Sequence, residues 1–169
     1  MDFMKLAEGR YSVRAFSGRT VENEKLEHIL NAGRLAPTAK NLQPQKIYVI
    51  KSEKGLEKIN SLYKYFGSKT VLMICADRDE CWKNPYTGHP SGEMDASIVA
   101  THMMLAAAEI GIGSTWVCCF DTEKAKELFN LPPEQQPLCL LPLGYPAENA
   151  EPSERHSQRK PLAETTVLI

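Results

Sequence analysis

The residues best suited to chemistry form two cationic groups that lie almost a full chain length apart. Arg10 and Arg14 bracket Ser12 in a segment that we expect to be extended or looped, and Arg159 lies near the other end of the chain. Guanidinium groups bind phosphate in a bidentate way, and a hydroxyl adds a further hydrogen bond. The pattern therefore favours a site for one anionic group, such as a phosphate.

The charge balance argues against a nucleic acid as the main partner. Twenty Lys and Arg residues stand against 21 Asp and Glu residues, which gives a formal net charge of -1. Binding a polyanion requires many phosphates to be neutralised over a broad basic surface. The two arginine groups are too local for that role, so we predict a small anionic ligand and no nucleic acid.

The other reactive side chains show no arrangement typical of a metal or nucleophile site. The four histidines have no ligand spacing to one another or to the five cysteines, and no CxxC pair occurs. The glycine-rich, nucleophile-elbow and zinc-protease motifs are also absent. We therefore predict no metal site, and we expect any catalysis to depend on a bound cofactor.

The elements that must position these residues mix helices and strands without regular βαβ alternation. We predict helices over residues 2–9, 22–35, 53–62, 93–110 and 122–129, and strands over residues 47–50, 71–76, 115–120 and 138–143. Helix 93–110 is apolar nearly all round, so it should be central or lie between two subunits. Asp95 is expected to be a charge at its N-terminus. The pattern favours a single α+β domain over residues 1–169.

Two segments lie outside this framework. Residues 77–92 are predicted to form a polar loop that carries Trp82, Tyr86 and His89, and residues 165–169 form a β-prone apolar tail that needs a sheet to pair with. No apolar run approaches the ~20 residues needed to span a bilayer. The N-terminus also lacks the apolar region of a secretory signal. We expect a cytoplasmic protein with no membrane partner.

Four segments together resemble the nitroreductase family of FMN-dependent flavoproteins. They are residues 10–16 (RYSVRAF), 36–44 (APTAKNLQP), 95–116 (ending in GIGSTW), and 141–146 (LPLGYP) followed by 159–162 (RKPL). They occur in the family's order and span nearly the whole chain. The resemblance implies a nitroreductase-like α+β fold with a central, mostly antiparallel sheet flanked by helices. It also implies a homodimer with FMN at the interface and a C-terminal tail that extends onto the partner subunit.

The resemblance also assigns the residues that contact FMN. Arg10, Ser12 and Arg159 match the positions at which the family holds the phosphate and ribityl chain of FMN. Tyr11, between Arg10 and Ser12 in the sequence, is also predicted to contact the cofactor. Arg14 falls near the pyrimidine edge, where a positive charge favours the reduced flavin. The remaining matches are the loop that the other subunit contributes, the strand end that faces the flavin and the phosphate end of the site: Pro37, Thr38, Ala39 and Asn41; Val117, Cys118 and Cys119; and Gly144. Trp82, Tyr86 and His89 are predicted lid residues on a separate ground, the lack of larger insertions over the site.

The chain departs from the family pattern in two respects. Cys119 stands where many relatives carry a glycine. The chain is also short for the family and lacks the larger helical insertions over the active site, which is why residues 80–92 are predicted to be the lid.

The function implied by the resemblance is a two-step oxidoreduction. Hydride passes from NAD(P)H through flavin N5 to an electron-poor acceptor such as a nitroaromatic or a quinone, and no side chain needs to act as an obligatory acid or base. Two alternatives remain open. One is a reductive dehalogenase or an enoyl-type reductase of the same family, and the other is a non-catalytic FMN-binding module.

Overall fold

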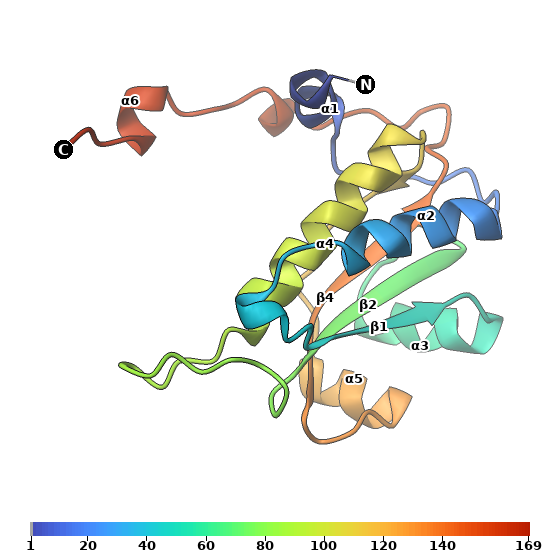
Figure 1. The fold of residues 1–169 in the computed structure, drawn as a ribbon. Helices are drawn as coiled ribbons and strands as arrows, with labels where there is room; N and C mark the ends of the chain where they lie inside the picture. Colours follow the sequence, from blue (N-terminus) through green and yellow to red (C-terminus); the bar gives the residue numbers. More distant parts are fainter. Residues whose placement is uncertain (1) are drawn as a thin grey trace.

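The computed structural model describes residues 2–169 and consists of one sheet with helices on both faces (Figure 1). The elements in chain order are α1 (Phe3–Gly9), α2 (Asn23–Arg34), η1 (Ala39–Asn41), β1 (Gln45–Ile50), α3 (Glu53–Leu62), β2 (Thr70–Asp77), α4 (Gly92–Glu109), β3 (Gly113–Ser114), α5 (Thr122–Phe129), β4 (Gln135–Gly144), η2 (Glu154–His156) and α6 (Leu162–Thr165). The two η elements are short 3-10 helices.

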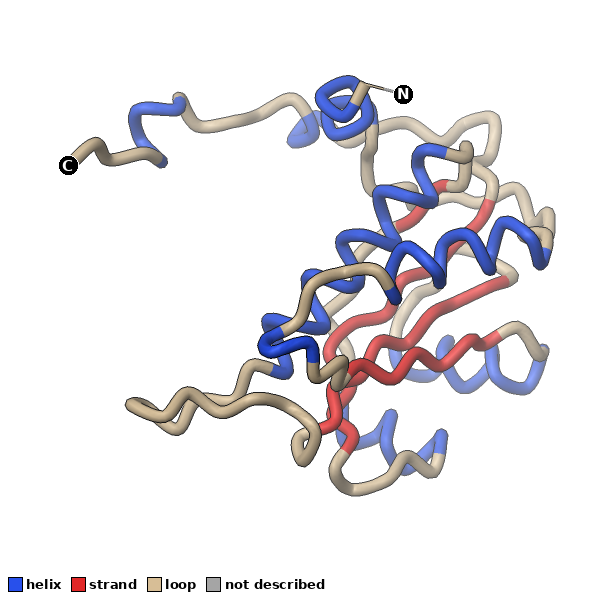
Figure 2. The backbone as a smooth tube through the Cα atoms, viewed as in Figure 1, coloured by secondary structure: helices blue, strands red, loops and turns tan. Residues whose placement is uncertain are grey.

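The strands, drawn in red in Figure 2, form one sheet. Its order is β1-β2-β4-β3, and all of its pairs are antiparallel. Every residue of β2 is buried, because helices cover both faces of this central strand. Its alternate residues enter two cores. Leu72 and Ile74 pack with α2 and α4, whereas Val71 and Met73 pack with α3 and α5. The predicted α+β fold and antiparallel sheet are confirmed.

Helix α4 is the longest element and crosses one face of the sheet against α2 (Figure 1). Val99 and Met103 are fully buried between them. A Cβ atom on Gly33 of α2 would lie 2.7 Å from Met103 Cγ, so the glycine permits the close approach of the two helices. The helix is thus central within the chain, which is one of the two positions that its apolar composition predicts.

The predicted strand over residues 115–120 is wrong in extent. Strand β3 ends at Ser114, and beyond it Val117 forms an isolated bridge with Leu140 of β4. The Thr115 amide donates to the Pro142 carbonyl, but Pro142 has no amide hydrogen to return a bond. The ladder is therefore interrupted next to this proline, and residues 118–120 turn toward α5.

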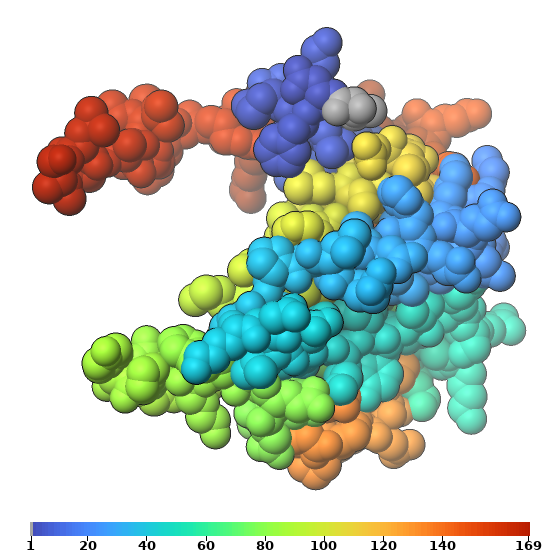
Figure 3. All heavy atoms as spheres, viewed as in Figure 1, coloured from blue at the N-terminus to red at the C-terminus, as the bar shows by residue number. Residues whose placement is uncertain are grey.

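Two segments project from the same side of the molecule, and a concave face lies between them (Figure 3). One is the loop between β2 and α4, and the other is the C-terminal arm that ends in α6. The apolar tail is exposed, and residues 166–169 pair with no strand of the described chain. None of the helices described over residues 2–169 combines the length and apolar composition needed to cross a membrane.

Candidate functional site

The segment that carries Arg10 and Arg14 is fixed against the end of the sheet. Ser12 forms a parallel bridge with Ser114, and the Val13 amide donates to the Ser114 carbonyl at 2.9 Å. Val13 is buried against Gly113, where a Cβ atom would lie 2.6 Å from Val13 Cγ2. Because side chains alternate along extended chain, burying Val13 turns Ser12 and Arg14 the other way.

The C-terminal arm returns to this segment through Tyr11. The Tyr11 hydroxyl donates to the Ala150 carbonyl at 3.2 Å, and the Tyr11 ring meets His156 edge to face with centroids 6.2 Å apart. These two contacts place η2 and Arg159 beside residues 10–14. Tyr11 was predicted to contact a cofactor, and the structure gives it a further role in holding the arm.

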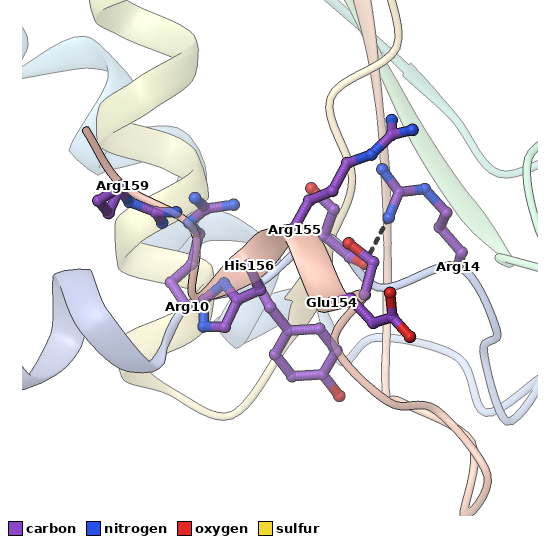
Figure 4. Close-up of a pocket in the computed structure, with 9 residues that line it drawn as sticks. Arg10, Arg14, Glu154, Arg155, His156 and Arg159 are labelled. Carbon is purple, nitrogen blue, oxygen red and sulfur yellow. Dashed lines mark hydrogen bonds between the residues drawn. The ribbon is translucent and has the colours of Figure 1, made fainter.

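An open hollow of about 720 Å³ forms where the two segments meet (Figure 4). It is lined by Arg10, Tyr11, Ser12, Arg14, Ser153, Glu154, Arg155, His156 and Arg159. In Figure 4, Arg14 and Arg155 extend to one side of the hollow, and Arg10 and Arg159 lie toward the other, near His156. The structure thus brings together the distant arginines that the sequence analysis singled out.

The four arginines on the hollow lack carboxylate partners. Among residues 2–169, the ion pairs involve other side chains, and Glu154 pairs with none of these guanidinium groups. Arg14 and Arg159 donate only to nearby backbone carbonyls, those of Ser12 and Gln158. Four guanidinium groups and one carboxylate, that of Glu154, line the hollow, so its net positive charge favours an anion.

Sequence reasoning missed Arg155 and His156. Both lie in a polar stretch without regular periodicity, so no pattern marked them. The one available signal was that Arg155 lies only four residues before Arg159, which had already been singled out. Their place on the hollow depends on the contact between Tyr11 and Ala150, which joins segments at opposite ends of the chain.

A second group of predicted residues lies at the other end of α4. The loop that contains Pro37, Thr38, Ala39 and Asn41 contacts Asp95 near the start of that helix, whereas Arg10 lies with Ala108 near its end. At a rise of about 1.5 Å per residue, these positions are about 20 Å apart along the helix axis. None of the four residues lines the arginine hollow.

Within one chain, the other residues predicted to contact FMN also lie away from the arginine hollow. Cys118 and Cys119 are exposed beyond the Val117 bridge, and the Trp116 indole N–H donates to Cys118 Sγ at 2.8 Å. Gly144 is buried, and a Cβ atom there would lie 2.9 Å from the Phe16 ring. The absence of a side chain at Gly144 therefore serves the packing of Phe16, and Gly144 does not line the hollow.

Two of the three predicted lid residues, Trp82 and His89, line a second hollow of about 540 Å³. It is lined by Ala39, Trp82, Asn84, Thr87, His89, Pro90, Ser91 and Met94. Tyr86 is 94% exposed at the tip of the loop and takes no part in it. The structure therefore brings Trp82 and His89 beside the loop of Ala39 and leaves Tyr86 outside.

Two buried thiols, those of Cys75 and Cys139, are held in their neutral form by their surroundings. Burial raises the pKa of Cys75 to about 12 and raises the pKa of Cys139 further, so neither thiol ionises readily. Within the part of the chain that the structure describes, no three His, Cys, Asp or Glu side chains gather to hold a metal ion.

The sequence and the fold can be matched to known proteins. Residues 7–66 and 60–145 match the model of the nitroreductase family. The chain is 30% identical over 157 residues to a protein of Methanothermobacter thermautotrophicus whose provisional name is NADH dehydrogenase/NAD(P)H nitroreductase, and the match covers 88% of this chain and 80% of that one.

Two crystal structures have a similar fold. A nitroreductase family protein from Clostridium difficile 630 aligns with a TM-score of 0.93 and 39% identity over 99% of this chain and 98% of that one. A provisionally named nitroreductase from Exiguobacterium sibiricum 255-15, in complex with FMN, aligns with a TM-score of 0.85 and 22% identity over 100% and 98%. Since the family model covers most of the chain, this protein belongs to the nitroreductase family.

Proposed function

We propose that this chain is an FMN-dependent oxidoreductase that takes electrons from NAD(P)H and reduces an electron-poor acceptor, such as a nitroaromatic or a quinone. One observation carries the proposal: four guanidinium groups without ion-pair partners in the described chain converge with Ser12 on one hollow, in a member of the nitroreductase family.

The residues of the hollow fit the phosphate end of FMN. A phosphate monoester carries a charge of about -1.5 to -2 at neutral pH and presents three strong acceptor oxygens. Arg10, Arg159 and Ser12 supply donors of the type that phosphate prefers, and the hollow's volume lies in the range of small-molecule sites. Arg155 adds a further cation that the sequence did not reveal.

The chain's own residues would bind and orient the cofactor. FMN, when bound, supplies the hydride transfer, which no side chain of the described chain provides. Arg10 and Arg159 would hold the phosphate, and Arg14 would place a fixed positive charge where negative charge develops during reduction. No acid or base is required of the protein, which agrees with the lack of catalytic motifs.

The complete site requires a second copy of the chain. The loop of Thr38 and Asn41 and the arginine hollow lie at opposite ends of α4, so one chain presents them to different places. The tail is exposed, and large apolar side chains flank the same loop at Leu35, Leu42 and Met94. We infer a homodimer in which each FMN is held by the arginines of one subunit and by Asn41 of the other.

Anaerobic flavin reduction tests the function. Protein purified with FMN should lose its flavin absorbance on addition of NADH or NADPH, and should regain it on addition of a nitroaromatic or quinone. Protein that stays colourless after incubation with FMN would contradict the cofactor assignment. Bleaching by neither nicotinamide would favour a non-catalytic FMN-binding module. Reoxidation only by an organohalide or an enoyl compound would show that the acceptor belongs to one of those classes and is not a nitroaromatic or a quinone.

A further inference from the structure

Asp95 lies near the N-terminus of its helix, as predicted, but its burial was not predicted. It lies in the first turn of α4, yet it is only 2% exposed. Its Oδ1 accepts a hydrogen bond from the Ala39 amide at 2.9 Å, and its Oδ2 accepts one from the Ser91 hydroxyl at 2.6 Å. The carboxylate therefore joins the helix to two loops, one on each side.

The first of these loops has a strained backbone. Lys40, Asn41 and Gln43 are non-glycine residues with φ angles of 51°, 56° and 53°. Each left-handed residue of this kind costs free energy and persists only where surrounding contacts impose it. Within the described chain, the bond from Ala39 to Asp95 is the one hydrogen bond that ties residues 38–43 to another element.

The second loop is closed by Ser91. The Ser91 amide donates to the Trp82 carbonyl at 2.8 Å, and further out the Asn84 amide donates to the His89 carbonyl at 2.9 Å. The 540 Å³ hollow lies between this loop and Ala39. Asp95 thus holds the base of the predicted lid and the loop of Asn41 across a shared hollow.

We propose that Asp95 is a positioning residue that fixes the strained loop of Asn41 for FMN and aligns the base of the lid with it. The inference rests on the proposed FMN site of this loop. The position of Asp95 in the first turn of α4 keeps a buried charge tolerable, because the helix N-terminus and two donors stabilise the carboxylate. Without it, the partly buried Ala39 amide would lose its one hydrogen-bond partner in the described chain.

Two variants separate the hydrogen bonds from the charge. Asp95→Asn keeps an acceptor for the Ala39 amide and a polar group for Ser91, whereas Asp95→Leu removes both bonds and keeps the branched shape of the side chain. Hydrogen exchange of the Ala39 amide in FMN-free protein reports the loop directly. We expect Asp95→Leu to lose this protection and to raise the FMN dissociation constant by about tenfold or more. Asp95→Asn should retain most of the Ala39 protection and most of the FMN affinity.

The controls distinguish positioning from general destabilisation. Val99→Ala lowers stability from the buried face of the same helix and should leave the Ala39 amide protected and FMN affinity unchanged. Should Asp95→Leu fail to fold, Asp95→Ala removes the same bonds with less bulk. Unchanged Ala39 protection in these variants, or equal loss of FMN affinity in Val99→Ala, would overturn the proposal.

A separate variant tests the proposed FMN site independently of the role of Asp95. Asn41→Ala removes the predicted FMN contact without touching Asp95, so it should weaken FMN while Ala39 stays protected. If Asn41→Ala binds FMN as tightly as the wild type, the loop is not part of the cofactor site, whatever Asp95 does. If Asn41→Ala weakens FMN and Asp95→Leu does not, the loop is in the site and Asp95 does not position it.

Discussion

The four arginines of the hollow differ in what holds their backbone. Arg10 and Arg14 come from a segment fixed by the bond between Val13 and Ser114, whereas Arg155 and Arg159 come from an arm held by Tyr11. In the described chain none of the four is neutralised by a carboxylate. An anion in the hollow would therefore pair with guanidinium groups that have no carboxylate partner in the described chain.

Replacing Arg159 by alanine should weaken FMN binding much more than folding. Loss of a hydrogen bond to a charged group costs about 1.5–3 kcal/mol, which corresponds to about a 10- to 100-fold rise in the FMN dissociation constant. The melting temperature of FMN-free protein should stay the same or rise, because a repulsive charge is gone. Fluorescence titration measures the affinity.

Two further variants complete this test. Arg155→Ala should also weaken FMN, since Arg155 lines the same hollow, whereas Arg34→Ala changes an exposed arginine on α2 and should have no effect. Wild-type affinity in Arg159→Ala would show that the phosphate lies elsewhere.

Glu22 is the carboxylate whose acidity the fold changes most clearly. The Tyr145 hydroxyl donates to Glu22 Oε2 at 2.6 Å, and this bond is the largest of several that lower the pKa of Glu22 from 4.5 to about 2. The backbone amide of Glu22 and the side chain of Arg19 lower it further. A depressed pKa means that the stabilisation is fully present above pH 4.5 and is lost as the pH falls toward 2.

Tyr145→Phe should therefore raise the pKa of Glu22 toward 4.5 in an NMR titration of its side-chain carboxyl. Glu22→Gln should flatten the dependence of unfolding free energy on pH between 4.5 and 2. The effect should shrink at high salt, because the group is exposed. An unchanged Glu22 pKa in Tyr145→Phe would contradict the stated cause.

Among the helical glycines of the described chain, Gly33 leaves the least room for a side chain. It lies at the contact between α2 and α4. Gly33 faces Met103 and Val99, which are both fully buried. Alanine has the higher helix propensity by about 1 kcal/mol, but overpacking a core costs about 1–3 kcal/mol. Packing should prevail here, because the atoms nearest to the new methyl group belong to buried side chains.

Gly33→Ala is thus expected to lower the unfolding free energy by about 1 kcal/mol in urea denaturation. Gly9→Ala is a matched control, since a Cβ atom on that helical glycine would meet no atom within 4 Å. It should be neutral or stabilising. A stabilised Gly33→Ala variant would show that Met103 can move away at little cost.

At the scale of the whole molecule, the apolar side chains of the projecting C-terminal arm are exposed in the described chain. The tail beyond α6 is exposed and apolar, and it extends from the same side as the lid loop (Figure 3). Apolar surface of this kind is stable in water only when something buries it. In the proposed homodimer, a second copy of the chain would bury this surface and would bring its loop of Asn41 to the arginine hollow.

Deleting residues 163–169 should convert the dimer to monomer and weaken FMN binding, because the tail would no longer hold the two half-sites together. Light scattering with FMN titration measures both outcomes. A scrambled tail of the same composition controls for the simple loss of apolar residues. An unchanged dimer after the deletion would refute the role of the tail.

Local patterns were enough to predict most of the elements. The continuous apolar run of β2 indicated a strand covered on both faces, and the composition of α4 indicated a central helix, as the structure confirms. The error in residues 115–120 had a non-local cause, because pairing there depended on Pro142 in another strand. Local preference alone could not show that the partner lacked an amide hydrogen.

By itself, the sequence determined the fold class, the separation of two arginine groups, and the type of ligand that guanidinium groups bind. Those properties follow from residue type and periodicity, which act over short distances. Only the tertiary structure decided that Arg155 joins the hollow and that Asp95 lies buried between two loops. Both depend on contacts between segments far apart in the chain, and such contacts arise from packing and hydrogen-bond satisfaction that no local pattern records.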